Sequence, residues 1–182
     1  MTSPAGSQTA APSLEQQLND LLLGRTDVPV AAAESCTGGM IGHRITTIPG
    51  CSDYFLGSLV TYANSAKMSL LGVPAEVLAS VGAVSEECAR AMAEGARRAY
   101  GATIAVSTTG IAGPTGATAR KPVGLVYIAL ADPSTTVVEE HRFTGDRLTV
   151  IDAATERALE LLVAAVERQL SELSSQAQPS GG

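Results

Sequence analysis

Residues 28–39 read VPVAAAESCTGG, and this stretch decides the fold that we expect. The apolar run Val28–Ala33 predicts a buried strand, and Gly38–Thr47 predicts a helix behind a sharp turn. The turn places Ser35 at the carboxyl end of the strand, where open α/β sheets usually bind ligands. The stretch therefore predicts a sheet with a functional site at one edge.

Further strands and helices alternate along the chain on either side of this stretch. We expect strands over Phe55–Tyr62, Thr103–Thr109, Pro122–Leu130 and Val137–Thr144. We expect helices from Leu14 to about Gly24, over Asn64–Leu71, Pro74–Ser80 and Glu86–Tyr100, and along an apolar stripe from Ile151 to Ala165. Ser13 with Gln16 predicts a capping box for the first helix, and Ser85 predicts an N-cap.

The order of these elements predicts the fold class. Helices separate the early strands, as in parallel crossover units, whereas Asp132-Pro133-Ser134 joins the last two strands too closely for anything but a hairpin. At least one strand must therefore run antiparallel. We predict an α/β fold, a three-layer α/β/α sandwich with a mixed, mainly parallel five-stranded sheet.

Length and composition indicate one domain. The 182 residues, of which 45% are hydrophobic and 16% charged, suffice for one core. Residues 1–12 and 174–182 are poor in large apolar groups and are predicted to be disordered tails. We therefore expect a single domain over residues 13–173.

Charge and hydropathy exclude several classes of partner. The formal net charge is −6, and only 3% of residues are aromatic, which argues against a basic or base-stacking surface for nucleic acid. No apolar run reaches the roughly 18 residues that span a bilayer, and the first residues lack signal-peptide features. Three cysteines form neither a disulfide framework nor a metal-ligand pattern. We expect a cytoplasmic protein with no membrane or nucleic-acid partner and no bound metal.

The turn after the first strand carries candidate catalytic groups. The free N–H groups at the start of the following helix can hold an anion or a developing oxyanion, and they belong to Cys36, Thr37, Gly38 and Gly39. The hydroxyl of Ser35 is a candidate nucleophile. The alternative is that Ser35 and Thr37 only cap the helix while the glycines permit a tight turn.

A serine nucleophile needs a base, and Lys67 is the candidate. It follows the second strand, so parallel neighbouring strands would place it at the same sheet edge as Ser35. A partly desolvated lysine can lose its proton near neutral pH, and Tyr62 could relay that proton. The alternative, a solvated lysine on a short helix, is commoner. Cys36 is a rival nucleophile, but neither histidine is placed to pair with it, which favours a small buried hydrophobe.

Two later segments offer groups for an anionic ligand. The loop over residues 107–116 contains Gly110 and Gly113, which let the backbone approach a ligand, together with hydroxyls such as that of Thr109. Such a loop is more often only a turn. Arg147 follows the last strand and could bind a phosphate or carboxylate, or instead pair with Asp146.

Six blocks occur in a recognisable order, namely AAESCTGG, LVTYANSAK, GAVS, TTGIAGPTG, KPVGLVYIAL and FTGDR. They resemble the CinA C-terminal domain family over roughly Leu14–Leu170. The stand-alone members of that family are nicotinamide-nucleotide amidohydrolases (PncC). The resemblance implies a three-layer sandwich that deamidates nicotinamide mononucleotide to nicotinate mononucleotide and ammonia without a cofactor. It also implies self-association as a homo-oligomer, for which we expect a dimer.

The resemblance also implies roles for single residues. Ser35 matches the family's nucleophile and Lys67 its base, while Tyr62, Thr109 and Arg147 match further active-site positions. Where many relatives read GIAGPDGG, this chain has Thr115 and Ala117 in place of Asp and the second Gly. The competing hypotheses are a nucleotide-binding or regulatory module without catalysis, and a general hydrolase of small amides.

Overall fold

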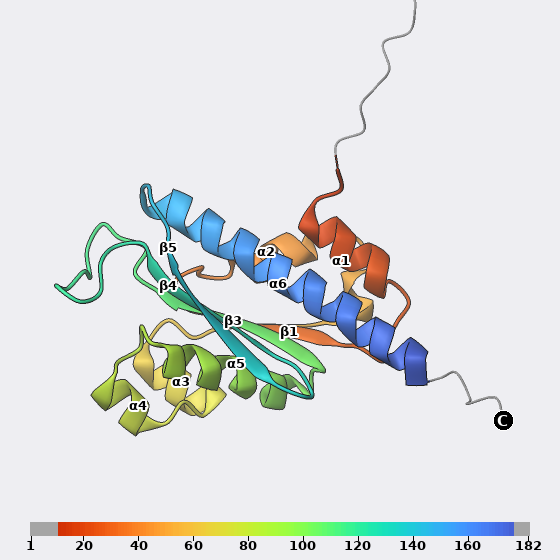
Figure 1. Cartoon of the computed structure of the whole chain (residues 1–182), viewed down its shortest axis with the longest axis horizontal. Helices are drawn as coiled ribbons and strands as arrows, with labels where there is room; N and C mark the ends of the chain where they lie inside the picture. Colours follow the sequence, from red (N-terminus) through yellow and green to blue (C-terminus); the bar gives the residue numbers. More distant parts are fainter. Residues whose placement is uncertain (1–10, 177–182) are drawn as a thin grey trace, which may run out of the picture.

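The computed structural model describes residues 11–176, which form five strands and six α-helices (Figure 1). The strands are β1 (Val30–Glu34), β2 (Phe55–Val60), β3 (Ile104–Gly110), β4 (Leu125–Ala131) and β5 (Thr136–Arg142). The helices are α1 (Leu14–Leu22), α2 (Met40–Thr46), α3 (Asn64–Leu71), α4 (Ala75–Ser80), α5 (Glu86–Tyr100) and α6 (Arg147–Gln176), with a 3₁₀ turn, η1, at Cys51–Asp53.

The five strands form one mixed sheet in the order β2-β1-β3-β4-β5. β2, β1 and β3 are parallel, and β4 runs antiparallel to both β3 and β5. The reversal at β4 arises because a loop without a helix, residues 111–124, returns the chain beside β3. In the register, Glu34 pairs with Val60 and with Thr108, so β1 and β2 end level at one edge and β3 continues two residues further, to Gly110.

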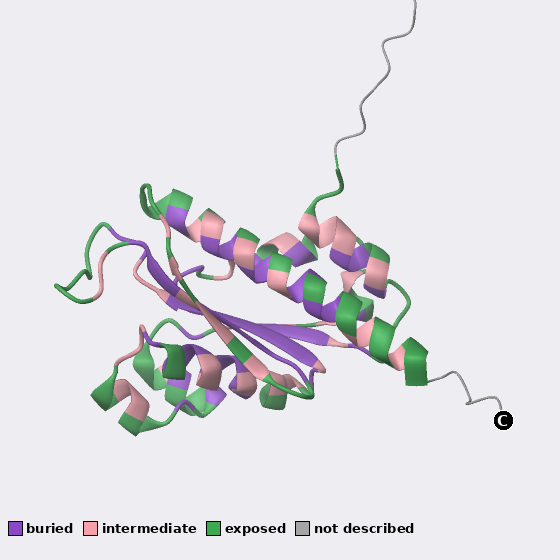
Figure 2. Cartoon of the chain, in the orientation of Figure 1, coloured by how far each residue is buried: buried purple, intermediate pink, exposed green. Residues whose placement is uncertain are grey.

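Helices cover both faces of the sheet, as predicted. α6 runs across one face together with α1 and α2, and α3, α4 and α5 lie on the other (Figure 1). Colouring by burial shows the central strands buried between the two helical layers, whose outer surfaces are exposed (Figure 2). The predicted three-layer α/β/α sandwich with a mixed sheet is confirmed.

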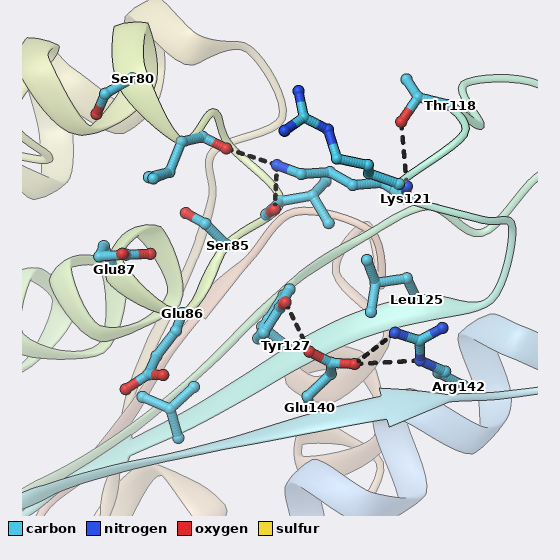
Figure 3. A pocket seen from close by; sticks show the side chains of 14 residues that line it. Ser80, Ser85, Glu86, Glu87, Thr118, Lys121, Leu125, Tyr127, Glu140 and Arg142 are labelled. Carbon is cyan, nitrogen blue, oxygen red and sulfur yellow. Dashed lines mark hydrogen bonds and ion pairs between the residues drawn. The ribbon is translucent and has the colours of Figure 1, made fainter.

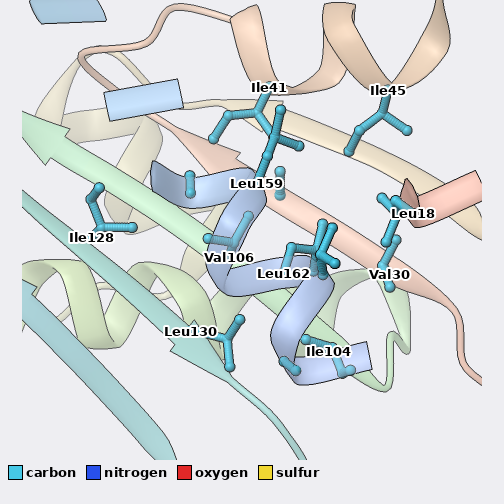
Figure 4. Close-up of a cluster of buried hydrophobic side chains, with 14 of the residues drawn as sticks. Leu18, Val30, Ile41, Ile45, Ile104, Val106, Ile128, Leu130, Leu159 and Leu162 are labelled. Carbon is cyan, nitrogen blue, oxygen red and sulfur yellow. The ribbon is translucent and has the colours of Figure 1, made fainter. Parts of the chain in front are cut away.

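Alternation along the strands divides the core between the two faces. On the α6 side, branched side chains from the strands interdigitate with helical leucines and isoleucines, as Figure 4 shows for Val106, Ile128, Leu159 and Leu162. On the α5 side, the strands present mainly small residues such as Ala31 and Ala33. Small side chains there let the helices approach the sheet closely.

The closest approach on the α5 side joins α3 to α5. A Cβ atom added at Gly95 of α5 would lie 2.2 Å from the carbonyl oxygen of Leu71, the last residue of α3. Only glycine therefore fits at this position. The contact fixes the distance between α5 and α3.

Several element ends differ from the predictions. Ser13 lies at the N-cap of α1, but its side chain makes no capping hydrogen bond, and Gln16 donates to Asp20 instead, so the predicted capping box is wrong. Ser85 does cap α5, accepting a hydrogen bond from the N–H of Cys88 at 3.2 Å.

The last helix is longer than predicted at both ends. α6 begins at Arg147 because Asp146 accepts hydrogen bonds from the N–H and the hydroxyl of Thr149, a local N-terminal cap. α6 continues to Gln176, so residues 174–176, predicted as part of a tail, are helical. The rest of that predicted tail, residues 177–182, and residues 1–10 of the N-terminal one lie outside the described residues. Within residues 11–176, no helix is both long and apolar enough to cross a membrane.

Candidate active site

Ser35 and Lys67 meet at the edge where β1 and β2 end. Ser35 follows the last residue of β1, and Lys67 lies one turn into α3. The Nζ atom of Lys67 is 2.9 Å from the Oγ atom of Ser35. Ser35 is 9% exposed and Lys67 is 1% exposed. The structure thus brings the candidate nucleophile and the candidate base into direct contact, away from bulk water.

The surroundings of Lys67 suit an uncharged amine. Burial lowers the pKa of Lys67, whereas the nearby thiols of Cys36 and Cys88 act in the opposite direction. Besides Ser35, Nζ contacts the carbonyl oxygens of Thr61 at 2.7 Å and Tyr62 at 3.1 Å. A neutral amine has two N–H bonds for these two carbonyls and one lone pair for the hydroxyl of Ser35.

A buried carboxylate that sequence reasoning missed lies immediately before Ser35, the candidate nucleophile. Glu34 is fully buried at the end of β1. Its oxygens accept hydrogen bonds from the N–H groups of Gly39, Ile41 and Gly42 and from the hydroxyls of Thr37 and Ser58. The signal for this group was an acidic residue directly after a buried apolar run, where an unpaired charge would be costly.

The position of Glu34 changes the set of amides that a ligand can reach. The N–H of Gly39 donates to Glu34, and that of Gly38 donates to the carbonyl of Ser35 at 3.2 Å. Within the described residues, the N–H groups of Cys36 and Thr37 have no hydrogen-bond acceptor. Of the four amides predicted to bind an oxyanion, the two next to the nucleophile remain open.

The thiol of Cys36 is a core group rather than a second nucleophile. Cys36 is 5% exposed and packs within the hydrophobic cluster on the α6 side. Burial raises the pKa of its thiol to about 12, so the thiol stays protonated near neutral pH.

Arg147 joins two loops beside the candidate pair. Its guanidinium donates to the carbonyl of Gly113 at 2.8 Å and to the hydroxyl of Tyr62 at 3.1 Å, and it makes no hydrogen bond to Asp146. The phenol of Tyr62 is largely exposed and points to Arg147, whereas its carbonyl contacts Lys67. The structure therefore brings Tyr62 to the base through its backbone and leaves the predicted proton relay through the phenol without a contact.

Thr109 and Gly110 have structural contacts of their own. The hydroxyl of Thr109 is buried and donates to the carbonyl of Ala83 at 2.7 Å. A Cβ atom at Gly110 would lie 2.7 Å from the carbonyl oxygen of Leu125, so glycine permits the close pairing of β3 with β4. The neighbouring Thr108, on the opposite face of β3, instead contacts Thr37 at 2.8 Å.

A hollow on the surface has neither Ser35 nor Lys67 in its lining. It has a volume of about 750 Å³ and is bounded by the start of α5 and the loop that precedes it, the loop before β4, and the faces of β4 and β5 on the α5 side of the sheet. Figure 3 shows partners for two of its charged groups: Lys121 donates to the carbonyls of Val81 and Val84, and Glu140 accepts from Tyr127 and Arg142. In the described part of the chain, no group of three or more His, Cys, Asp or Glu residues could hold a metal ion.

Comparisons with known proteins place this geometry in a family. A family model for the CinA C-terminal domain matches residues 11–166. The CinA-like protein of Salinibacter ruber is 55% identical over 135 residues, which cover 74% of this chain and 32% of that protein. The CinA-like protein of Solibacter usitatus is 51% identical over 141 residues, which cover 78% of this chain and 34% of that protein. The chain thus spans about a third of the length of these curated relatives.

Solved structures match the whole sandwich. The competence/damage inducible protein CihA from Agrobacterium tumefaciens superposes with a TM-score of 0.78 at 39% identity, covering 86% of this chain and 98% of that one. The CinA superfamily protein from Klebsiella pneumoniae 700603 superposes with a TM-score of 0.80 at 32% identity, and the match covers 85% of this chain and 96% of that one. Because the family model matches residues 11–166 and these relatives and structures agree with it, the chain belongs to the CinA C-terminal domain family.

Proposed function

We propose that this protein is an amidohydrolase that converts nicotinamide mononucleotide to nicotinate mononucleotide and ammonia without a metal ion, with Ser35 as nucleophile and Lys67 as base. The observation that carries the proposal is the 2.9 Å contact between the amine of Lys67 and the hydroxyl of Ser35. The lysine is buried, and its burial lowers the pKa of the amine. The substrate comes from the resemblance of the chain to the PncC members of its family.

In the first half of the reaction, Ser35 Oγ attacks the carboxamide carbon. The hydroxyl proton passes to the lone pair of Lys67, and the carbonyl oxygen becomes an oxyanion. The open N–H groups of Cys36 and Thr37 donate to that oxygen, and such donors are often worth about 3 kcal/mol each. The carbonyls of Thr61 and Tyr62 hold the resulting ammonium of Lys67 in place.

The tetrahedral intermediate then collapses. The C–N bond breaks, the leaving nitrogen takes the proton from Lys67, and ammonia departs. This leaves an ester between Ser35 and the nicotinoyl group. Water attacks the ester while Lys67 takes a proton from it, the C–O bond to Ser35 breaks as Lys67 returns that proton to Ser35 Oγ, and nicotinate mononucleotide is released. Lys67 thus carries one proton in each half-reaction, and the enzyme returns to its starting state.

Arg147 is the group that we assign to the phosphate of the substrate. It lies at the same end of the sheet and can exchange its hydrogen bonds to Gly113 and Tyr62 for a bidentate contact with phosphate oxygens. We assign Thr109 and Gly110 to shaping the loop that carries Gly113. A local cation suffices for an anionic substrate despite the net charge of −6, because charges are screened beyond about 8 Å.

Ammonia release from nicotinamide mononucleotide, with and without EDTA, tests the proposal. We expect activity that EDTA does not change, that Ser35→Ala abolishes, and that Lys67→Met lowers at least a hundredfold in kcat with little change in KM. The other lysine of the chain, Lys121, is a matched control, because its amine also donates hydrogen bonds to two backbone carbonyls. It lies in the surface hollow rather than beside Ser35. Lys121→Met should turn over at the wild-type rate.

The outcomes separate the competing functions. Activity that survives Ser35→Ala would remove Ser35 as nucleophile, and a KM defect alone in Lys67→Met would reassign Lys67 to substrate binding. Equal rates on free nicotinamide, which lacks the phosphate, would indicate a general amide hydrolase. Binding of the nucleotide without ammonia release would indicate a nucleotide-binding or regulatory module.

A further inference from the structure

The carboxylate of Glu34 occupies an unusual environment. It is fully buried, and within the described residues no lysine or arginine forms an ion pair with it. Its Oε2 accepts from Thr37 Oγ1 at 2.8 Å, Gly39 N at 2.9 Å and Ile41 N at 3.1 Å, and its Oε1 accepts from Gly42 N at 2.9 Å and Ser58 Oγ at 2.7 Å. Neutral donors alone thus compensate the desolvation of a buried charge.

These donors come from three segments near Ser35. Three are amides at the start of α2, which the helix leaves unbonded and which favour negative charge. Ser58 belongs to β2. Thr37 belongs to the turn that carries Ser35, and its hydroxyl also contacts Thr108 of β3. Because the Thr37 proton goes to Glu34, the Thr108 hydroxyl must donate to Thr37, which extends the network to β3.

The network has two consequences for the turn over residues 35–39. The carboxylate of Glu34, which precedes the turn, accepts a hydrogen bond from the N–H of Gly39 at the other end of the turn. This bond restricts the backbone that carries Ser35. The network also uses the amides of α2, so that only those of Cys36 and Thr37 stay open next to the nucleophile. Glu34 therefore takes the amides of Gly39, Ile41 and Gly42, and within the described residues the amides of Cys36 and Thr37 are left without an acceptor.

We propose that Glu34 is a positioning residue, which holds the turn so that Ser35 reaches Lys67 and the amides of Cys36 and Thr37 remain available to an oxyanion. The inference rests on the proposed function, since it assigns Glu34 a part in the chemistry of the same Ser–Lys pair. Glu34 acts through the turn and does not contact the reacting atoms.

Glu34→Gln tests the role with a nearly isosteric side chain. An amide has one oxygen and one NH₂ group, so the NH₂ would face donors and at least one of the five hydrogen bonds must break. The probe is a small fluorophosphonate: Ser35 Oγ bonds to phosphorus, fluoride leaves, and the hydroxyl proton passes to Lys67 and then to solvent. Its rate of labelling at Ser35, measured by mass spectrometry, reports the nucleophile and its oxyanion donors without the natural substrate.

Glu139→Gln is the matched control. Glu139 accepts from Arg157 and from the ring of His141, and it lies on β5, at the sheet edge opposite β2. Its loss should lower the melting temperature but leave labelling of the folded protein unchanged. We expect Glu34→Gln to label about ten- to a hundredfold more slowly and to lose kcat on nicotinamide mononucleotide by a similar factor, with KM within twofold. Labelling and kcat equal to wild type in folded Glu34→Gln protein would overturn the inference.

A milder variant keeps the test decisive if Glu34→Gln does not fold. Ser58→Ala removes one donor and leaves the carboxylate in place, and we expect labelling to slow two- to fivefold; an unchanged rate would refute the positioning role. The two proposals also fail differently. A wild-type protein that labels at Ser35 in a Glu34-dependent way but releases no ammonia refutes the substrate and supports the inference. A wild-type protein that does not label at Ser35 refutes both.

Discussion

Replacing Gly95 with Ala tests the packing that sets the position of Lys67. A Cβ atom at Gly95 would lie 2.2 Å from the carbonyl oxygen of Leu71, and Cβ atoms essentially never approach such an atom within 3.0 Å. The gap between α3 and α5 must therefore widen by about 0.8 Å, from 2.2 to 3.0 Å. Because the clash is with backbone, no side-chain rotation relieves it.

Two opposing effects set the change in stability. Alanine favours an interior helical position over glycine by about 1 kcal/mol. Overpacking costs about 1–3 kcal/mol, and the upper value applies here because the contact atom is rigid. The net loss is then about 2 kcal/mol, which lowers Tm by about 4–8 °C for a domain of this size.

Activity should fall as well, because Leu71 lies one turn after Lys67 on the same helix. A shift of about 1 Å in a catalytic group can cost a hundredfold in rate, and the flexible lysine side chain absorbs part of it, so we expect about a tenfold loss of kcat. Calorimetry and ammonia release measure both effects, with Arg98→Ala, an exposed position on α5, as the unchanged control. A Gly95→Ala protein that melts higher and keeps the wild-type kcat would refute the argument.

Three further predictions concern titrating groups. Because burial raises the pKa of Cys36 to about 12, Cys36→Ala should keep wild-type activity, and mass spectrometry should find no iodoacetamide on Cys36 in the folded protein at pH 8. Burial lowers the pKa of Lys67 in the folded protein, so between that lowered pKa and about pH 10.4 the lysine binds more protons in the unfolded chain than in the folded one. The free energy of unfolding of the wild type, relative to that of Lys67→Met, should therefore increase with pH over this interval, as urea titrations can measure. Burial raises the pKa of Asp132, but hydrogen bonds from Ser134 and Arg168 outweigh it and lower the pKa to about 2. Asp132 should therefore add about 2 kcal/mol above pH 4 that is lost as the pH falls through about 2, so the stability deficit of Asp132→Asn should shrink in acid.

The fold could be predicted because its signals are local and repeated. Apolar runs mark the strands, helices separate the first three, and the Asp132 turn demands a hairpin; in the structure Asp132 accepts from the N–H groups of Ser134 and Thr135, as such a turn requires. The meeting of Ser35 and Lys67 follows from the same pattern, since parallel neighbours end at one edge. The start of α6 was missed because the capping role of Asp146 depends on Thr149, outside the apolar stripe.

Side-chain directions at the site could not be predicted, because they depend on tertiary partners. The place of Glu34 directly after a buried apolar run signals an unusual charge, but its partners in α2 and at Ser58 appear only in the fold. Tyr62 leaves the sheet where the backbone turns, so spacing alone cannot decide whether its phenol or its carbonyl meets Lys67. The same limit applies to Thr109, whose hydroxyl points to Ala83 rather than to the edge of the sheet.

The state of the thiol beside the nucleophile bears on how the site tolerates oxidants. Peroxides attack thiolates, and the susceptibility of a cysteine follows its exposure and its thiolate fraction. Cys36 is 5% exposed and protonated near neutral pH, and Cys88, the other thiol near Lys67, is also buried with a raised pKa. The candidate reacting group is an alcohol, which peroxide does not modify in this way. The proposed hydrolase would therefore keep its candidate nucleophile under oxidative stress that inactivates enzymes with a catalytic cysteine.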